Sequence, residues 1–301
     1  MLKQILSKIK NKLILFCTAL AALLLYLSPN LSADESVPLG EKNQLTVMTF
    51  NLRFANENDP YPWSIRKEAV REFLKERQPD IFGTQEGIYS QLQDIIGKES
   101  AYDWIGTGRD GGSNGEFMAI FYKKDRFSPI KFDHLWLSET PRLIGSRSWD
   151  TACTRMVTWV LFEDNQTHQR FYFVNTHLDH VSQKARVNGA KVICSVIKNF
   201  DKKLPVFLTG DFNVYADNTE VHSQFEKIGM TDTWEAPNQI RSESYNTFND
   251  FKLPGKDGQR IDWIFTNNKV KVLSTEIVPP QEGKTWLSDH SPVISVVNLQ
   301  N

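Results

Sequence analysis

Short apolar runs recur along the chain and predict β-strands. They are rich in β-branched and aromatic residues, which pack well on a pleated, half-buried surface. Polar or glycine-containing segments separate one run from the next. The pattern predicts strands over residues 45–51, 81–86, 117–122, 155–162, 170–177, 205–210, 261–266, 270–276 and 293–299.

Other segments have the 3.6-residue apolar period of helices. They cover residues 64–78, 88–96, 182–200 and 220–228. Ser64 is expected to cap the N-terminus of the first helix. The buried face of that helix is expected to contain Ile65, Ala69, Phe73 and Leu74.

The order of these elements predicts one α/β domain. The strands at 155–162 and 170–177 flank the polar segment Glu163-Asp164-Asn165 and are expected to form a hairpin. Helices inserted between strand-rich segments favour two sheets packed face to face, with helices outside. No Pro/Gly/Ser-rich linker and no internal repeat divides the chain, so the domain is expected to span residues 42–300.

The first 33 residues differ from the rest. Four lysines precede an apolar run over residues 13–27, and Ser28-Pro29-Asn30 and the small residue Ala33 follow it. This order is typical of a secretory signal peptide over residues 1–33. The alternative is an uncleaved N-terminal anchor, although the run of 15 residues is shorter than the about 20 that span a bilayer. We therefore expect a secreted or periplasmic protein that contacts a membrane only through this segment.

Without that segment the chain is acidic. The whole sequence has 35 basic and 36 acidic residues, and the first 33 residues hold four lysines and no acid, which leaves 31 against 36 and a net charge of −5. Binding along nucleic acid depends on neutralising phosphates with Lys and Arg, so nucleic acid is the less favoured partner. Cys153 and Cys194 permit one disulfide, but Cys194 lies in a helical pattern and is expected to be a small buried residue.

Carboxylate, amide and imidazole side chains occur where the apolar strands end. Burying such a group is costly unless it is paired or bound to a metal ion. Each has a simple structural explanation on its own; Asp262, for example, could pair with Arg260. Together they predict one polar site assembled from distant segments, with Asn51, Glu86, His177, Asp179, Asp211, Asn213, Asp262, Asp289 and His290 as members.

The chemistry of this set favours a metal-assisted reaction. Its ligands are oxygen and imidazole without thiolate, which suits Mg²⁺ or Mn²⁺, and Mg²⁺ is commonly held by few carboxylates together with water and substrate phosphate. The histidines suit acid–base chemistry. Hydrolysis of a phosphate ester needs positioning and charge stabilisation and no nucleophilic serine.

The resemblance to a known family rests on six motifs in order. They are Asn51, Gln85-Glu86, Asn175-Thr176-His177, Gly210-Asp211-Phe212-Asn213, Arg260-Ile261-Asp262 and Ser288-Asp289-His290. They resemble those of the endonuclease/exonuclease/phosphatase superfamily, which includes deoxyribonuclease I, neutral sphingomyelinases and inositol polyphosphate 5-phosphatases. The resemblance implies a four-layer α-β-β-α sandwich of two mainly antiparallel sheets, with the site at one end of the sheets.

The resemblance also implies a metal site and contacts to the substrate. Glu86 would be the main ligand of Mg²⁺, or of Mn²⁺, with Asn51 and Asp289 contributing. Arg53 and Arg155 would contact the anionic substrate near the metal. For Arg155, a salt bridge at a strand start is an equally good explanation.

The remaining roles that the resemblance implies are catalytic. His290 would contact the scissile phosphate and orient or deprotonate the attacking water, and Asp262 would fix its tautomer. Asp211 and Asn213 would hold that water and a phosphate oxygen. His177 would polarise a non-bridging oxygen.

Several further segments resemble a bacterial branch of the superfamily, secreted or cytoplasmic, whose substrates are unassigned. Among them are Asn51-Leu52-Arg53 and Gly106-Thr107-Gly108-Arg109-Asp110. The overlapping glycine-rich segment Gly108-Arg109-Asp110-Gly111-Gly112 is expected to form a mobile loop that shapes the pocket. Aromatic residues in loops have two interpretations, because they either line a sugar or headgroup pocket or pack within a lid. They are Tyr61, Trp63, Trp136 and Trp149.

Three functional hypotheses follow. The first is a metal-dependent phosphoric ester hydrolase, a phosphodiesterase or phosphatase, acting on a small phosphorylated sugar, inositol or lipid headgroup. The second is a secreted deoxyribonuclease or other endonuclease, which the acidic charge disfavours. The third is a non-catalytic binding module, which the complete set of polar residues disfavours. We expect the protein to be a monomer.

Overall fold

The computed structural model describes residues 43–300, apart from residues 98–99, 218, 237–238 and 241. These residues belong to the compact unit Leu39–Asn301. The expected signal peptide or anchor, residues 1–33, lies outside the described residues. Within the described part of the chain, no helix is both long enough and apolar enough to cross a membrane.

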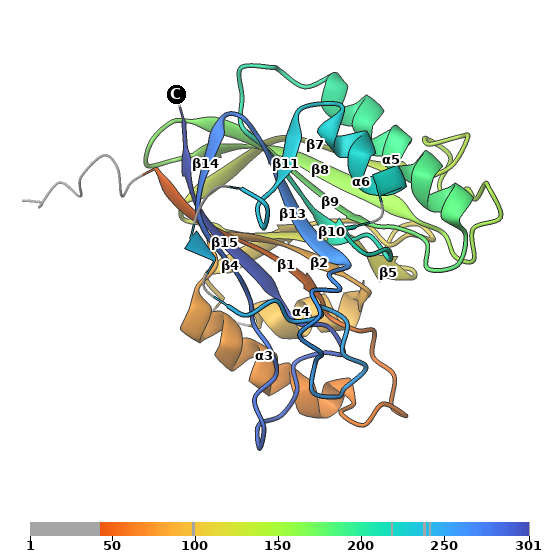
Figure 1. Ribbon diagram of the computed structural model, residues 1–301, viewed down its shortest axis with the longest axis vertical. Helices are drawn as coiled ribbons and strands as arrows, with labels where there is room; N and C mark the ends of the chain where they lie inside the picture. The colour runs from red at the N-terminus through yellow and green to blue at the C-terminus, as the bar shows by residue number, and fades with distance from the viewer. Residues whose placement is uncertain (1–42, 98–99, 218, 237–238, 241, 301) are drawn as a thin grey trace, which may run out of the picture. The chain divides into compact units, whose positions relative to one another are not determined.

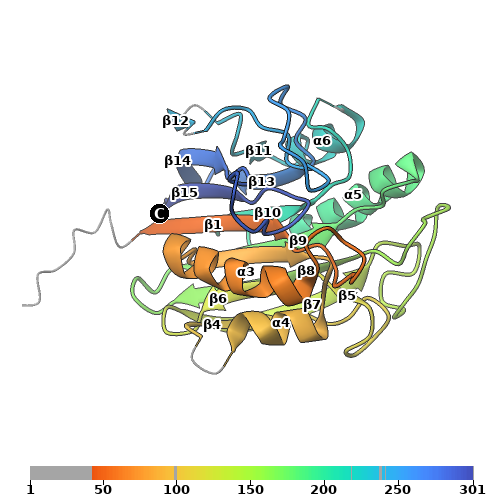
Figure 2. The ribbon, with the colours of Figure 1, turned by 90° about the horizontal axis from the view of Figure 1, so that it is seen from below.

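Two large β-sheets form the centre of the described unit (Figures 1 and 2). The first has seven strands in the spatial order β12 (Gln239–Ile240), β14 (Val270–Ile277), β15 (Val293–Leu299), β1 (Gln44–Asn51), β2 (Ile81–Gln85), β6 (Ile120–Lys123) and β4 (Tyr102–Ile105). The second has six, in the order β11 (Met230–Asp232), β13 (Asp262–Asn267), β10 (Val206–Asp211), β9 (Arg170–His177), β8 (Met156–Asp164) and β7 (Phe127–Trp136). Most neighbouring strands are antiparallel, and the parallel pairs are β1 with β2, β9 with β10, and β12 with β14.

Helices cover the outer faces of both sheets (Figure 1). Apolar residues of α3 (Trp63–Arg77) and α4 (Tyr89–Ile96) pack on the first sheet. Those of α5 (Gln183–Lys198) and α6 (Thr219–Glu226) pack on the second. A short two-stranded sheet pairs β3 (Gly87–Ile88) with β5 (Glu116–Phe117).

Continuous apolar runs explain these layers. Along β10, Phe207 lies in the core between the sheets, whereas Leu208 packs in the cluster with α5 and α6. Along β1, Val47 lies between the sheets and Met48 packs in the cluster with α3 and α4. Successive side chains of a strand point to opposite faces, so a strand that is covered on both faces needs apolar residues at consecutive positions. The predicted α-β-β-α sandwich is confirmed.

The buried face of α3 differs from the prediction. Ile65 is 54% exposed, whereas Arg66 is fully buried. The N-cap is Pro62 and not Ser64. Arg66 is tolerated inside because backbone carbonyl groups satisfy its guanidinium, which a hydrophobic period cannot predict.

The strand prediction is incomplete at the sheet edges. The run over residues 117–122 is divided between β5 and β6, and Met118 and Ala119 lie between the two strands. The pattern misses β4 and β7, which form an edge of each sheet. Most residues in the middle of β7 are exposed, and the strand has an irregularity between Pro129 and Lys131. Edge strands with proline, charge and exposed faces carry little apolar alternation.

The longest helix, α5, agrees closely with its prediction. Ser182 is its N-cap, and its side chain accepts a hydrogen bond from the backbone N–H of Ala185. Cys194 is buried in the helix, as predicted. Cys153 and Cys194 are both free thiols, so the disulfide that the sequence permits is not formed.

Candidate active site

Strands of both sheets bring the predicted polar residues to one end of the sandwich, where the strands terminate. In the first sheet, Asn51 ends β1 and lies opposite the end of β2, which precedes Glu86. In the second sheet, Asp211 at the end of β10 is paired with His177 on β9 and with Asp262 on β13. The parallel pairs β1 with β2 and β9 with β10 end at the same end of the sandwich, and the antiparallel β13 begins there. Side chains that are far apart in sequence are therefore close together at this end.

The loop before β15 adds Asp289 and His290, because β15 runs antiparallel to β1. His290 Nδ1 lies 2.9 Å from Asp262 Oδ2, and both side chains are buried. This contact fixes the ring so that Nε2 is the nitrogen left for other partners. An ion pair between Asp262 and Arg260 is excluded, because Arg260 is paired with the buried Asp232 at 2.9 Å.

The Asn51 side chain joins the two sheets at the site. Its amide nitrogen donates to Glu86 Oε1 at 3.1 Å and to Asp211 Oδ2 at 2.9 Å. The same nitrogen is 3.5 Å from His290 Nε2. Its oxygen accepts a hydrogen bond from the Arg53 backbone N–H at 2.9 Å. A single buried amide thus contacts its own loop and three distant segments of the chain.

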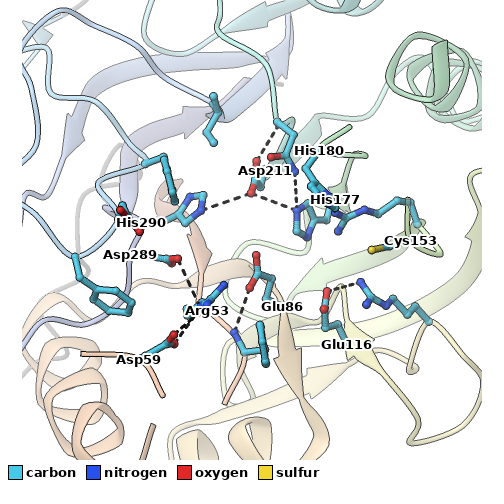
Figure 3. A pocket seen from close by; sticks show the side chains of 18 of the residues that line it. Arg53, Asp59, Glu86, Glu116, Cys153, His177, His180, Asp211, Asp289 and His290 are labelled. Atoms are coloured by element: carbon cyan, nitrogen blue, oxygen red, sulfur yellow. Dashed lines mark hydrogen bonds and ion pairs between the residues drawn. The ribbon is translucent and has the colours of Figure 1, made fainter. Parts of the chain in front are cut away.

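Asp211 lies between the two histidines (Figure 3). Its Oδ2 is 3.3 Å from His177 Nε2 and 3.8 Å from His290 Nε2. Its Oδ1 accepts a hydrogen bond from the backbone N–H of Asn213 at 2.9 Å. The Asn213 amide nitrogen is in turn 2.9 Å from His177 Nε2. The residues to which the sequence assigns catalysis therefore form one connected network.

Burial and neighbouring charges shift the ionisation of this network. Burial, and secondly the Asp262 carboxylate, raise the pKa of Asp211. Burial and the charge of Arg155 hold the pKa of His177 well below its ordinary value. Burial alone would lower the pKa of His290, but the carboxylates of Asp262 and Asp211 outweigh it and raise that pKa well above its ordinary value. The two histidines therefore have opposite tendencies to carry a proton.

A buried polar bridge between the sheets supports the strand ends. The Asn175 side-chain oxygen on β9 accepts hydrogen bonds from Gln85 at 2.7 Å and from Thr209 at 3.1 Å. Its nitrogen donates to two backbone carbonyl groups. Gly83 makes room for the bridge, because a Cβ at this position would collide with the side chains of Asn175 and Thr209. A larger residue would push the sheets apart directly behind the site.

Three residues of the site have left-handed backbone conformations. They are Arg53 with φ 54°, Glu86 with φ 61° and Asn213 with φ 51°. For residues other than glycine this conformation costs about 1 to 3 kcal/mol and persists where the surroundings enforce it, often at functional sites. All three residues line the same cavity. Local backbone strain therefore coincides with the predicted site.

The cavity over these strand ends has a volume of about 600 Å³ (Figure 3). Most of its basic side chains are already paired with carboxylates. The pairs are Arg53 with Asp59 at 2.9 Å, Arg109 with Glu116 at 2.6 Å and Lys252 with Asp250 at 2.7 Å. Arg109 belongs to the glycine-rich loop that the sequence predicts to shape the pocket. Burial raises the pKa of its partner Glu116 to about 7.

Arg155 is different from the other basic residues of this cavity. Its side chain is 6% exposed, and its Nε is 4.0 Å from the nearest carboxylate, that of Asp179. Its Nη2 lies 3.1 Å from His180 Nδ1. Nε and Nη1 have no hydrogen-bond partner among the residues that the structure describes. A buried guanidinium with unused N–H groups is a suitable donor for an anionic ligand.

Asp179 supports a loop and does not line the cavity, which corrects its inclusion in the predicted site. One oxygen accepts hydrogen bonds from the Thr151 hydroxyl and the Ala152 backbone N–H. The other accepts from the backbone N–H groups of Val181 and Ser182. These contacts anchor the segment after β9 at the start of α5, so the carboxylate has a structural role.

Aromatic residues line the cavity, but the loop aromatics with two interpretations, pocket lining and packing within a lid, are not among them. Tyr61, Trp63, Trp136 and Trp149 lie outside its lining. Trp136, for example, is buried and donates to the Arg109 carbonyl group at 2.6 Å. The lining contains Phe54, Phe248 and Phe251 instead. These phenylalanines follow no strand or helix period, so the sequence pattern carries no signal for their position.

The donor set of the cavity fits a divalent cation. Ligand atoms of Glu86, Asp211 and His290 lie within 4.8 Å of one another. Asp289, a predicted ligand, lines the same cavity, and its Oδ2 is 3.7 Å from Arg53 Nε. Asn51 would present its oxygen only after a half-turn of its amide group, because its nitrogen now faces Glu86. Carboxylate and amide oxygens with imidazole suit Mg²⁺ or Mn²⁺, and Glu86 belongs both to the predicted ligands and to this cluster of candidate ligand atoms.

The family model described as "Endonuclease/Exonuclease/phosphatase family" matches residues 48–290. The chain belongs to this family. The superfamily resemblance of its motifs is thereby confirmed, and the chain is a phosphoric ester hydrolase. The endonuclease/exonuclease/phosphatase family is typically metal-dependent, in agreement with the donor set around Glu86.

Solved structures of this family are similar over nearly the whole described unit. An endonuclease/exonuclease/phosphatase from Bacteroides vulgatus is 36% identical, with a TM-score of 0.80 over 85% of this chain and 99% of that chain. The mannosyl-6-phosphatase Bt3783 from Bacteroides thetaiotaomicron is 34% identical, with a TM-score of 0.78 over 84% of this chain and 99% of that chain.

Protein angel from Drosophila melanogaster is 24% identical over 191 residues, 60% of this chain. The chain spans about half of the length of that curated relative, 52%.

Proposed function

We propose that this enzyme is a phosphatase that removes a single phosphate group from a phosphorylated sugar. The observation that carries the proposal is the charge of the cavity, in which Arg155 is the one lining arginine or lysine with no carboxylate of the described residues closer than 4.0 Å. One available guanidinium beside two histidines suits a compact anion. A nucleic acid needs several basic side chains along its backbone. The similarity to a mannosyl-6-phosphatase supports a sugar phosphate as the substrate class.

The proposed reaction is the attack of water on phosphorus. A bond forms between the water oxygen and phosphorus and the ester P–O bond breaks. The water gives up one proton and the leaving sugar oxygen takes up one, so the products are phosphate and the sugar as an alcohol. Arg155 and His177 would hold non-bridging oxygens, and His290, positioned by Asp262, would donate to the phosphoryl group from Nε2. Asp211, between the histidines, would accept a hydrogen bond from the attacking water. Such placement supplies most of the catalysis in phosphoryl transfer.

We infer that Glu86 would hold a divalent cation, with Asn51 and Asp289 beside it. A bound ion would stabilise the negative charge that develops on the phosphoryl group and on the leaving oxygen. Asn51 would keep Glu86 and Asp211 at their present separation, since its amide contacts both.

Removal of the Arg155 charge tests the proposal. We expect Arg155→Met to lower kcat/KM for mannose 6-phosphate by about 10- to 100-fold, because a hydrogen bond to a charged group contributes about 1.5 to 3 kcal/mol. Lys252→Met is the matched control, because Lys252 lines the same cavity but is exposed and paired with Asp250. Phosphate release gives the rates, and circular dichroism reports whether each variant is folded. Equal losses in both variants, or no loss in Arg155→Met, would contradict the assignment.

A further inference from the structure

A second cavity, of about 420 Å³, adjoins the catalytic cavity. Asn213, Phe248 and Ile261 line both. Asn213 belongs to the catalytic network, because its amide contacts His177. The second cavity therefore begins directly beside the place where the phosphate would be held, and its volume lies in the range of small-molecule sites.

The second cavity differs from the catalytic cavity in charge. Outside the three shared residues, the described residues of its lining are Val214, Tyr215, Asn246 and Gln259. None of these lining side chains is charged. The catalytic cavity, in contrast, is lined by carboxylates, guanidinium groups and imidazoles. A group that leaves the catalytic cavity along the shared wall passes from a charged to a neutral environment.

Aromatic rings and amides dominate this neutral lining. The Tyr215 and Phe248 side chains are 47% and 46% exposed, although large aromatic residues are usually buried. Gln259 is exposed as well. Phe248 also packs against His290, with ring centroids 5.1 Å apart, so one ring borders both the catalytic network and the second cavity. Two open aromatic rings beside amide groups form a surface for a ligand that is apolar on one face and polar at its edges.

We propose that the second cavity binds a neutral sugar unit linked to the phosphorylated sugar, so that the substrate is a phosphorylated oligosaccharide. This inference rests on the proposed function. The C–H groups on a pyranose face carry slight positive charge and pack on the electron-rich face of an aromatic ring. Its hydroxyl groups exchange hydrogen bonds with amides such as those of Asn246 and Gln259. The phosphate-bearing sugar occupies the catalytic cavity, and the next sugar occupies the cavity beyond Phe248.

Other occupants fit this lining less well. A nucleobase would stack on the same rings, but the phosphates that accompany it need basic side chains, and the lining of the second cavity has none. A second phosphate group would also find no cationic partner there. A neutral sugar needs neither, and the continuity of the two cavities places it one unit from the scissile phosphate.

The test compares two substrates on the full-length protein. One is mannose 6-phosphate, and the other is a mannose disaccharide that carries one 6-phosphate. We expect kcat/KM for the disaccharide to be about tenfold higher, because one aromatic contact contributes up to about 1.5 kcal/mol. Tyr215→Ala should bring the ratio of the two kcat/KM values close to one, whereas Tyr215→Phe, which keeps the ring, should preserve most of it. Gln259→Ala should reduce the ratio without changing the aromatic surface.

Each outcome distinguishes the subsite from the proposed function. Equal kcat/KM for the two substrates in the wild type, or an unchanged ratio in Tyr215→Ala and Gln259→Ala, would overturn the subsite while leaving the phosphatase intact. If neither sugar phosphate is hydrolysed, both the proposed function and the subsite are wrong. A 5′-phosphorylated oligonucleotide serves as the third substrate. If Tyr215→Ala impairs only its hydrolysis, the cavity binds nucleobases and the inference is wrong.

Discussion

Replacement of Arg66 by methionine is expected to destabilise the protein and to disturb the active site. Arg66 is fully buried on α3. Its guanidinium donates to the carbonyl groups of Tyr61 at 2.7 Å, Leu52 at 2.6 Å, Leu287 at 2.9 Å and Arg53 at 3.1 Å, and a longer contact reaches the Phe54 carbonyl group at 3.5 Å. These acceptors belong to the loop that follows β1 and to the loop that carries the catalytic histidine. One side chain therefore ties two site-forming loops to a helix.

The size of the effect follows from these contacts. A net contribution of about 1 kcal/mol for each of the four hydrogen bonds gives about 4 kcal/mol. The carbonyl groups left without a donor add to the loss, and release from the cost of burying a charge subtracts from it. That cost is visible in the pKa of Arg66, which burial lowers to about 10. Methionine fills a similar volume, so we expect a net loss of about 3 to 5 kcal/mol in the free energy of unfolding.

Urea denaturation measures this loss, and phosphate release at a temperature where the variant is folded measures its effect on kcat. Lys67→Met is the matched control on the same helix, and we expect it to change stability by less than about 0.5 kcal/mol. We also expect kcat of Arg66→Met to fall, because the Arg53 and His290 loops lose their shared anchor. A variant within 1 kcal/mol of the wild type would show that these carbonyl contacts do not stabilise the loops.

Two further perturbations concern the reacting centre. Exhaustive treatment with EDTA should abolish hydrolysis, and Mg²⁺ or Mn²⁺ should restore it. Added Mg²⁺ should also raise the melting temperature of the wild type but not that of Glu86→Gln. Full activity after chelation would show that the metal has no part in the mechanism. Asp262→Asn should lower kcat by about 10³- to 10⁴-fold with a native circular dichroism spectrum, as expected when the partner of a catalytic histidine loses its charge. A wild-type rate in that variant would show that the 2.9 Å contact with His290 has no catalytic role.

The fold could be predicted where apolar runs are continuous. Strands such as β10 and β15 are covered on both faces, and apolar residues at consecutive positions of these strands indicate this from the sequence alone. The edges could not be predicted in the same way, because β7 has exposed positions and a bulge where alternation is lost. The wrong prediction for the buried face of α3, where Arg66 is buried and Ile65 is exposed, has a different cause. Whether an arginine can be buried depends on carbonyl groups of distant loops, and these do not appear in the period of its own helix.

The site could be predicted where its residues lie at a strand end or just beyond it. Asp211 ends β10, Glu86 directly follows β2 and Asn213 lies shortly after β10, and parallel strand pairs bring such positions together. Asp179 also follows a strand, yet local backbone N–H groups saturate its carboxylate. The pairing of Arg109 with Glu116, and of the other basic residues with their carboxylates, could not be predicted, because it depends on loop geometry. That pairing determines which charge remains for the substrate.

Substrate preference tests the central claim most directly. Phosphate release from mannose 6-phosphate would be measured beside cleavage of bis-p-nitrophenyl phosphate and plasmid DNA, with Mg²⁺ present and His290→Ala as the blank. A cavity with one available guanidinium predicts kcat/KM for the sugar phosphate about 100-fold or more above that for the diester, with the plasmid intact. Nicked plasmid with mannose 6-phosphate untouched, or phosphate release that persists in His290→Ala, would contradict the account.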